Sequence, residues 1–379
     1  MQQIINRGNK TTYLELQNQK LSYRLLIEKR YKAEEEGKPD FFYFNDMEIL
    51  AYYLQHQTNL DERKGKSERT IQAYKQELLA FISHILNYQD SIGIQFNQMD
   101  SDSLFKSLLP SHLEKYQFWL VEKYPYIIGR NSSYSPATIA RKNAIIKSFL
   151  RFLYEVSYID KDVTRQMKQA TVNNDERPNR DLGVNEVIEL LDFFSEVVDQ
   201  PVIFGIIHLL VTTGMRNEEL CKLQVGDIEY DADRNRYYLH ITGKGNKKRI
   251  VPLRDKVIDS INLLRAARNV PYIEDSSPSM PIIVTSTGKA YSSSYLSQYL
   301  RNVIQRTNLP MLQKKTITPH TFRHAFAIIS YRSGNDIFKI MRSLGHENIE
   351  TTQIYLPKEM EKDEFSTLHW DKTAIRKYI

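Results

Sequence analysis

Apolar residues recur every three or four positions in the first half of the chain, which is the spacing of a helix with one buried face. Ser67 is a residue type that caps helices, and an apolar stripe follows it at Ile71, Tyr74, Leu78, Phe81, Ile82 and Ile85. Ser135 followed by Pro136 is a second helix start. Its apolar stripe consists of Ile139, Ile146, Phe149, Leu150 and Leu153. The pattern predicts a helical domain over residues 65–170.

The second half of the chain mixes helical and strand patterns. One helical face is predicted at Val187, Leu190, Leu191 and Phe194. The apolar run 203–213 predicts a buried helix that ends at Gly214, and further helices are predicted over 292–307 and from Thr321. Alternation over 237–241, a turn at 243–246 and a returning strand over 249–253 predict a β-hairpin. The fold class is therefore mainly α with a small β-sheet.

Two polar stretches interrupt this periodicity, and we interpret them as linkers because neither can bury much surface. They cover residues 61–67 and 171–181. The chain then divides into an N-terminal extension (1–64), a helical domain (65–170), a linker (171–181) and a C-terminal domain (182–379).

The composition narrows the classes of function. A single cysteine excludes a disulfide framework and a cysteine-based zinc or iron–sulfur site. No apolar run has the length of a membrane span, and the polar start lacks a signal-peptide core, so we expect a cytoplasmic protein with no membrane partner. Lysine and arginine number 52 against 46 aspartates and glutamates, which permits a polyanionic partner without establishing one.

Four short segments, residues 213–220, 243–249, 318–324 and 344–355, combine side chains suited to chemistry on phosphate. Each alone has an ordinary explanation: an arginine after a helix-ending glycine is usually a surface cap, and one tyrosine among 24 usually belongs to core or surface. The candidates in chain order are Arg216, Lys244, His320, Arg323, His346 and Tyr355.

Together the segments resemble the tyrosine recombinases, the phage-integrase and Xer-like family of site-specific DNA recombinases. The order Arg, Lys, His-x-x-Arg, His, Tyr is that family's catalytic set, and residues 219–220 and 344–345 match its flanking positions. The resemblance covers the C-terminal domain and, more loosely, residues 67–160, whereas residues 1–60 match no segment we can name. It implies a helical, SAM-like core-binding domain and a mixed α/β catalytic domain that form a C-shaped clamp on DNA.

The resemblance assigns each candidate a role that its chemistry suits. Tyr355 is the nucleophile, which forms a 3′-phosphotyrosyl intermediate. Arg216 and Arg323 offer planar forks of donors with permanent charge to the non-bridging phosphate oxygens. His320 is the expected proton acceptor or hydrogen-bond partner. Lys244 is expected to protonate the leaving 5′-oxygen from the hairpin.

Further residues receive supporting roles. By the resemblance, His346 contacts the phosphate and orients the site. Glu219 either fixes the guanidinium of Arg216 or forms an ordinary surface pair, and His324 is expected in a packing or supporting place. Basic residues on the hairpin and on the outer face of the helix after Ser135 are DNA-binding candidates, although a merely solvated face is an equal alternative. These candidates are Arg141, Lys142, Lys147, Arg151, Lys247 and Lys248, the last two also being rivals of Lys244 as the acid.

The implied partners are double-stranded DNA with inverted-repeat core sites, further copies of the chain (a dimer on one site, a tetramer in synapsis) and, as an open option, accessory DNA-bending proteins. No cofactor or metal is implied, because the phosphotyrosyl bond retains the energy needed for rejoining. The extension could bind accessory DNA sites or only pack on the helical domain. The tail after Tyr355 is expected to dock on a neighbouring protomer or to fold back on its own domain.

The role within the family stays open. We favour integration and excision of a mobile element, with an Xer-like dimer-resolving recombinase and a tyrosine-type transposase as alternatives. A catalytically inactive DNA-binding regulator is a rival of another class, but a binder needs neither Tyr355 nor Lys244. A metalloenzyme built on His320, His324 and His346 is disfavoured, because the fixed cation of Arg323 lies between the first two.

Overall fold

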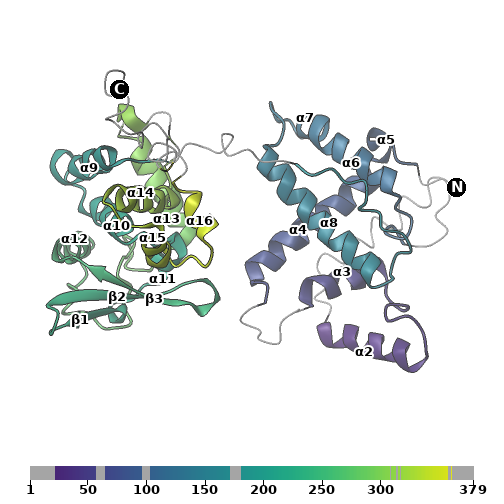
Figure 1. Cartoon of the computed structure of the whole chain (residues 1–379), viewed down its shortest axis with the longest axis horizontal. Helices are drawn as coiled ribbons and strands as arrows, with labels where there is room; N and C mark the ends of the chain where they lie inside the picture. Colours follow the sequence, from purple (N-terminus) through teal and green to yellow (C-terminus); the bar gives the residue numbers. More distant parts are fainter. Residues whose placement is uncertain are drawn as a thin grey trace, which may run out of the picture. The chain divides into compact units, whose positions relative to one another are not determined.

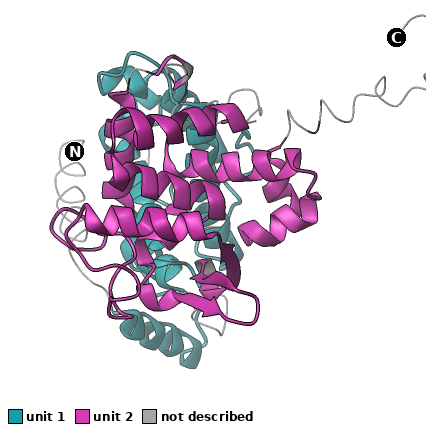
Figure 2. Cartoon of the chain, turned by 90° about the vertical axis from the view of Figure 1, so that its left-hand side faces the viewer, with its two compact units in different colours: residues 1–176 teal, residues 177–379 magenta. Residues whose placement is uncertain are grey.

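The computed structural model describes residues 22–56, 65–95, 103–170, 181–307, 309–312, 315, 317–356 and 360. The chain divides into two compact units, residues 1–176 (unit 1) and 177–379 (unit 2), which Figure 2 colours separately. The described part of unit 1 is helical, and unit 2 combines helices with a three-stranded sheet (Figure 1). The predicted fold class, mainly α with a small β-sheet, is confirmed.

The helices of unit 1 begin where the sequence places cap residues. Ser67 accepts a hydrogen bond from the Thr70 N–H at 3.2 Å, and Ser135 accepts one from the Thr138 N–H at 3.3 Å. Both predicted helix starts are confirmed. The helices are α2 (Tyr23–Glu35), α3 (Asp46–Gln55), α4 (Glu68–Asn87), α5 (Gln89–Ile92), α6 (Pro110–Glu122), α7 (Tyr124–Ile127) and α8 (Pro136–Glu155).

One hydrophobic core joins the described helices of unit 1, including part of the segment that the sequence set apart as an extension. Ile49 and Leu50 of α3 are buried in the same cluster as Phe81 of α4 and Phe149 of α8. The carboxylate of Asp46 accepts hydrogen bonds from the Leu104 N–H at 2.7 Å and the Tyr158 hydroxyl at 2.8 Å. Residues 22–56 therefore pack into the same core as the helices after residue 65.

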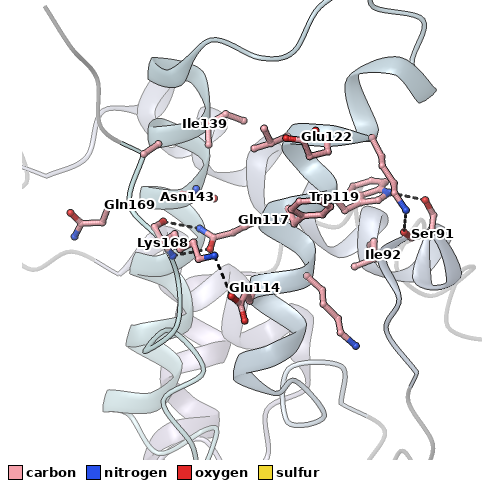
Figure 3. Close-up of a pocket in the computed structure, with 15 residues that line it drawn as sticks. Ser91, Ile92, Glu114, Gln117, Trp119, Glu122, Ile139, Asn143, Lys168 and Gln169 are labelled. Atoms are coloured by element: carbon pink, nitrogen blue, oxygen red, sulfur yellow. Dashed lines mark hydrogen bonds and ion pairs between the residues drawn. The ribbon is translucent and has the colours of Figure 1, made fainter.

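Unit 1 also contains a cavity of about 520 Å³ lined by α5, α6, α8 and residues 168–170 (Figure 3). Beside it, the Gln117 side chain pairs with the backbone of Lys168, donating to its carbonyl and accepting from its N–H, both at 2.9 Å. All six candidate catalytic residues belong to unit 2, so this cavity is not the site of the expected chemistry.

In unit 2, three strands form an antiparallel sheet in the order β1-β2-β3, which lies at the lower edge of this unit in Figure 1 with the labelled helices above it. The predicted hairpin is confirmed as β2 and β3, with Leu239 opposite Val251. The sequence missed β1, which pairs with β2 along its whole length. The elements are α9 (Val184–Asp192), α10 (Pro201–Thr213), α11 (Asn217–Lys222), β1 (Ile228–Asp231), β2 (Arg236–Thr242), β3 (Lys248–Leu253), α12 (Asp255–Ala266), α13 (Ser293–Gln305), α14 (Pro319–Arg332), α15 (Ile337–Leu344) and α16 (Ile349–Gln353).

Helix α10 is the buried centre of unit 2 and packs against α12 and α14. Gly205 permits the close approach to α12, because a Cβ there would lie 2.8 Å from the Ser260 carbonyl oxygen. Gly214 then ends α10 in the left-handed conformation with a φ of 60°, as the sequence predicts. The chain leaves α10 directly into the segment that carries Arg216.

Of the helices that the structure describes, none combines the length and apolar character needed to cross a membrane.

Candidate active site

Four separate segments bring the candidate residues together in unit 2. Arg216 precedes α11, Arg323 lies within α14, His346 follows α15 and Tyr355 follows α16. Two of the helices that lead into the site, α10 and α15, end in left-handed glycines, Gly214 at a φ of 60° and Gly345 at 66°. The polypeptide therefore turns sharply at the two points where it enters the site.

Arg323 is the buried centre of this arrangement, with 1% of its surface exposed. Its two terminal nitrogens donate to the carbonyl oxygens of Gly214 and Leu344, each at 2.6 Å. These carbonyls belong to the ends of α10 and α15, where helices carry partial negative charge. Burial, and then the charge of Arg216, lower the pKa of Arg323 to about 10, so the guanidinium remains charged at neutral pH.

The tautomer of His346 follows from its two neighbours. Arg323 Nη2 lies 2.7 Å from His346 Nε2, and an arginine can only donate, so Nε2 is the acceptor. Nδ1 therefore carries the proton and donates to Thr352 Oγ1 at 2.8 Å. Burial, followed by the charge of Arg323, lowers the pKa of His346 to about 3. The ring is thus neutral at pH 7 and holds the fork of Arg323 in place.

Glu219 is almost fully buried, at 4% exposure, and joins two arginines. It accepts from the backbone N–H of Arg216 at 2.8 Å and from Arg216 Nη1 at 2.9 Å. Arg249 of β3 donates to both carboxylate oxygens, at 3.0 and 2.7 Å. Burial alone would raise the pKa of Glu219, but the bonds from Arg249 and Arg216 outweigh it and lower the pKa to about 2. Of the two alternatives left open for Glu219, the structure shows the fixed guanidinium and not a surface pair.

Tyr355 lies among three histidine rings. The ring centroids of His320, His324 and His346 are 5.6, 4.1 and 5.5 Å from that of Tyr355. His324 is buried and is the nearest of the three, which agrees with the packing place expected for it. His320, near the N-terminus of α14, is exposed.

The hairpin reaches the same site. Lys244 lies in the 3₁₀ turn 244–246 between β2 and β3, and its side chain lies outside the described part of the chain. A Cβ at Gly243 would lie 2.9 Å from Glu219 Oε1, so the base of this turn rests against the carboxylate. Lys247 forms an ion pair with Glu347, next to His346, and Lys248 is exposed.

Sequence reasoning missed Arg249, although a signal for it was present. Along β3, Lys248 and Ile250 are exposed whereas Val251 and Leu253 are buried. Arg249 has the same parity as the buried pair, so strand alternation places it on the inner face. From the sequence, only the lysines of segment 243–249 were named as candidates, and the strand alternation was not applied to Arg249.

The DNA-binding candidates on α8 do not share one face. Arg141 and Arg151 are exposed and Lys147 is half-buried. Lys142 instead points inward: its Nζ lies 2.6 Å from Glu77 Oε1 of α4, with 15% and 12% of the two side chains exposed. The expectation that Lys142 lies on an outer face is wrong, because its long side chain finds a carboxylate on the neighbouring helix.

Known proteins with similar sequences include members of one enzyme family. Residues 180–362 match the phage integrase family. The tyrosine recombinase XerD of Staphylococcus saprophyticus is 30% identical over 341 residues, covering 87% of this chain and 96% of the relative. XerD of Staphylococcus epidermidis is 29% identical over 335 residues, with the same coverage.

Solved structures share the fold at low sequence identity. A XerH site-specific recombinase bound to its palindromic difH substrate has a TM-score of 0.57 and 19% identity, covering 79% of this chain and 80% of that one. A lambda integrase dimer bound to a core site has a TM-score of 0.58 and 15% identity, covering 82% and 77%. The Tn1549 transposon integrase in complex with DNA has a TM-score of 0.54 and 17% identity, covering 84% and 98%.

Proposed function

Because this chain belongs to the phage integrase family of tyrosine recombinases, enzymes that cleave and rejoin DNA at specific sites, we propose that Tyr355 and the residues around it perform the cleavage. The observation that carries this proposal is the convergence on Tyr355. Three histidine rings surround the phenol, and one of them, His346, is held by the buried Arg323. Two stretches of the sequence supply these groups: α14 carries His320, Arg323 and His324, and the chain after α15 carries His346 and Tyr355.

In the proposed reaction the phenol oxygen of Tyr355 attacks the phosphorus of a DNA phosphodiester. A 3′-phosphotyrosyl bond forms as the bond to the 5′-oxygen breaks, and the 5′-oxygen leaves with a proton. Attack by the 5′-hydroxyl of another strand reverses the step and releases the tyrosine. The phosphotyrosyl bond retains the energy of the phosphodiester, so no nucleotide is consumed.

The charged groups are suited to the phosphate. The side chain of Arg216 is 38% exposed, and its Nη1 donates to Glu219 Oε1 at 2.9 Å. Together with Arg323 it offers positive charge where negative charge grows in the transition state. We propose His320, whose ring centroid lies 5.6 Å from that of Tyr355, as the acceptor of the phenol proton and Lys244 as the acid for the 5′-oxygen.

The proposed partners are double-stranded DNA with inverted-repeat core sites and other copies of this chain. Related structures include a lambda integrase dimer on a core site and a lambda integrase tetramer on a Holliday junction. For this chain we propose two protomers on one site and four in synapsis. The C-shaped clamp on DNA is a statement about how the two units are arranged, and it stays a prediction. The tail after Tyr355 lies outside the described residues apart from Leu356 and Met360.

We propose integration and excision of a mobile element as the biological role, and the transposon and phage integrases among the structural neighbours support it. Resolution of DNA dimers is a second candidate, favoured by the XerD relatives, which match over 87% of the chain. A footprint of the protein on the ends of an adjacent mobile element, compared with chromosomal candidate sites, separates the two.

The direct test of the chemistry is Tyr355→Phe on a nicked suicide substrate, which traps the covalent protein–DNA adduct. The variant removes one oxygen, so half-site affinity should persist while the adduct disappears. Tyr295→Phe, at an exposed position on α13, is the matched control and should form the adduct normally. An adduct with Tyr355→Phe would show that another residue is the nucleophile.

A further inference from the structure

We propose that Arg249 is a positioning residue that keeps Glu219 from cancelling the positive charge of Arg216. The inference rests on the proposed function of Arg216 as a phosphate ligand and adds a residue to it. Arg249 comes from the β-hairpin, whereas Glu219 and Arg216 lie at the start of α11.

The geometry of Glu219 shows that its carboxylate is fully occupied. Oε1 accepts from Arg216 Nη1 at 2.9 Å and Arg249 Nη1 at 3.0 Å. Oε2 accepts from the Arg216 backbone N–H at 2.8 Å and Arg249 Nη2 at 2.7 Å. Four donors therefore fix one carboxylate, and the parallel pair from Arg249 is the bidentate arrangement that only an arginine provides.

The electrostatic reason for Arg249 follows from the substrate. A carboxylate beside Arg216 holds that guanidinium in place, but it also repels an approaching phosphodiester. With Arg249 present, the second guanidinium balances Glu219 and leaves the charge of Arg216 available. Without Arg249, the pair of Arg216 and Glu219 would be close to neutral at the point where the transition state needs positive charge.

Arg249 is less exposed than Arg216, with 11% of its side chain exposed against 38%. Both of its terminal nitrogens donate to Glu219. The remaining nitrogen, Nε, is buried and has no partner among the described residues. Arg249 therefore acts on the reaction through Glu219 and not by touching the DNA.

The same side chain contacts a further segment of the site. A Cβ at Gly345 would lie 3.2 Å from Arg249 Cδ, so the chain just before His346 packs on the arginine stem. Gly243, before Lys244, also packs here, because a Cβ there would lie 2.9 Å from Glu219 Oε1 and 3.7 Å from Arg249 Nη1. Arg249 thus links the hairpin to the segments of Arg216 and His346, and an effect through the hairpin must be separated from an effect through Glu219.

The experiment compares three proteins: the single variants Arg249→Ala and Arg249→Lys, and the double variant that carries both Arg249→Ala and Glu219→Gln. Single-turnover cleavage is measured at saturating DNA on an ordinary nicked substrate and on one with sulfur at the bridging 5′ position. A 5′-thiolate leaves without an acid because a thiol titrates near 8.5. Half-site affinity and thermal unfolding are measured alongside, and Arg236→Ala, an exposed arginine on β2, is the matched control.

We expect Arg249→Ala to cleave about 10²-fold more slowly on both substrates, with half-site affinity nearly unchanged. Arg249→Lys should recover less than about tenfold, because one ammonium cannot make the parallel pair of bonds. Adding Glu219→Gln to Arg249→Ala should recover at least about tenfold, since the uncompensated charge is removed. Arg236→Ala should cleave like the parent.

Three results would overturn the inference. Rescue of Arg249→Ala by the sulfur substrate would mean that Arg249 serves the acid on the hairpin. Failure of Glu219→Gln to recover activity would mean that Arg249 is only structural, and unchanged cleavage would mean that it has no role. If Tyr355→Phe kept the adduct, the proposed function would fail instead, whatever the Arg249 variants showed.

Discussion

Unit 1 and unit 2 both place basic side chains beside carboxylates, but the stoichiometry differs. Among the ion pairs described in unit 1 the least exposed is one to one, with Lys142 Nζ 2.6 Å from Glu77 Oε1. In unit 2 a single buried carboxylate serves two arginines. A third, Arg323, contacts no carboxylate among the described residues and donates to carbonyl oxygens instead. The pair of Lys142 and Glu77 joins α8 to α4, whereas an excess of buried positive charge is costly unless an anion is to bind there.

Among tests of this difference between the two units, we expect Arg323→Ala to have the largest effect on stability and cleavage. The change removes two charge-assisted hydrogen bonds and leaves the Gly214 and Leu344 carbonyls without their donor. We expect unit 2 to lose about 2–4 kcal/mol in urea unfolding and cleavage to be lost on ordinary and sulfur substrates. The exposed Arg301→Ala should change neither. Undiminished stability would contradict the structural part of this prediction.

Lys244→Ala should have the next largest effect, and only on the chemical step. General-acid help is typically worth about 10²–10⁴-fold, so cleavage of ordinary DNA should fall by that amount. On the sulfur substrate the rate should approach that of the parent. Lys248→Ala, on the same hairpin, is the control, and the sulfur substrate should not raise its cleavage rate relative to the parent. If rescue instead occurs with Lys247→Ala or Lys248→Ala, the acid lies at that lysine.

The pH dependence of stability should report the buried charges of unit 2. Burial and then Arg323 lower the pKa of His346 to about 3, whereas an unfolded histidine titrates near 6.5. Between these values the unfolded chain binds more protons, so the free energy of unfolding should fall as the pH falls below about 6.5. His346→Gln should flatten this fall, measured by urea unfolding at pH 7 and pH 5. His84→Gln is the matched variant in unit 1, where burial and then Lys142 lower the pKa of His84 to about 4.

The smallest expected effect separates two adjacent residues of α8. Arg141 is exposed, whereas Lys142 is held by Glu77. If Arg141 contacts a phosphate, Arg141→Ala should reduce the slope of log affinity against log salt by about 0.9, and Lys142→Ala should leave it unchanged. Half-site binding over a range of salt concentrations measures both. A slope change with Lys142→Ala would mean that the ion pair opens on DNA.

The sequence predicted best what depends on neighbouring residues. Ser67 and Ser135 cap helices through bonds three residues away, and Gly214 ends α10 by its own conformation, so local pattern was sufficient. β1 was missed because it is only four residues long and its strand character comes from pairing with β2. The inward turn of Lys142 depends on Glu77, a partner 65 residues distant in sequence that no local pattern reveals.

The residues of the site could be predicted from the sequence only because they resemble the catalytic set of a known family. Nothing near Arg323 in the sequence indicates that its guanidinium reaches Gly214, 109 residues away. Arg249 could have been found by strand alternation, but its partner Glu219 could not. Local sequence patterns were sufficient to predict several helices and the β-hairpin. Which side chains contact one another depends on tertiary packing.

The bonds from Arg323 to the ends of α10 and α15 have a consequence for how such a protein could lose its activity over evolution. Removing the hydroxyl of Tyr355 takes away the nucleophile at little expected cost to the fold, whereas removing Arg323 strips two helix ends of their donor. In a descendant that binds DNA without cleaving it, we therefore expect the tyrosine to be substituted before the arginine. A relative that retains this arginine but lacks the tyrosine should be read as a folded relic of an enzyme and not as a working one.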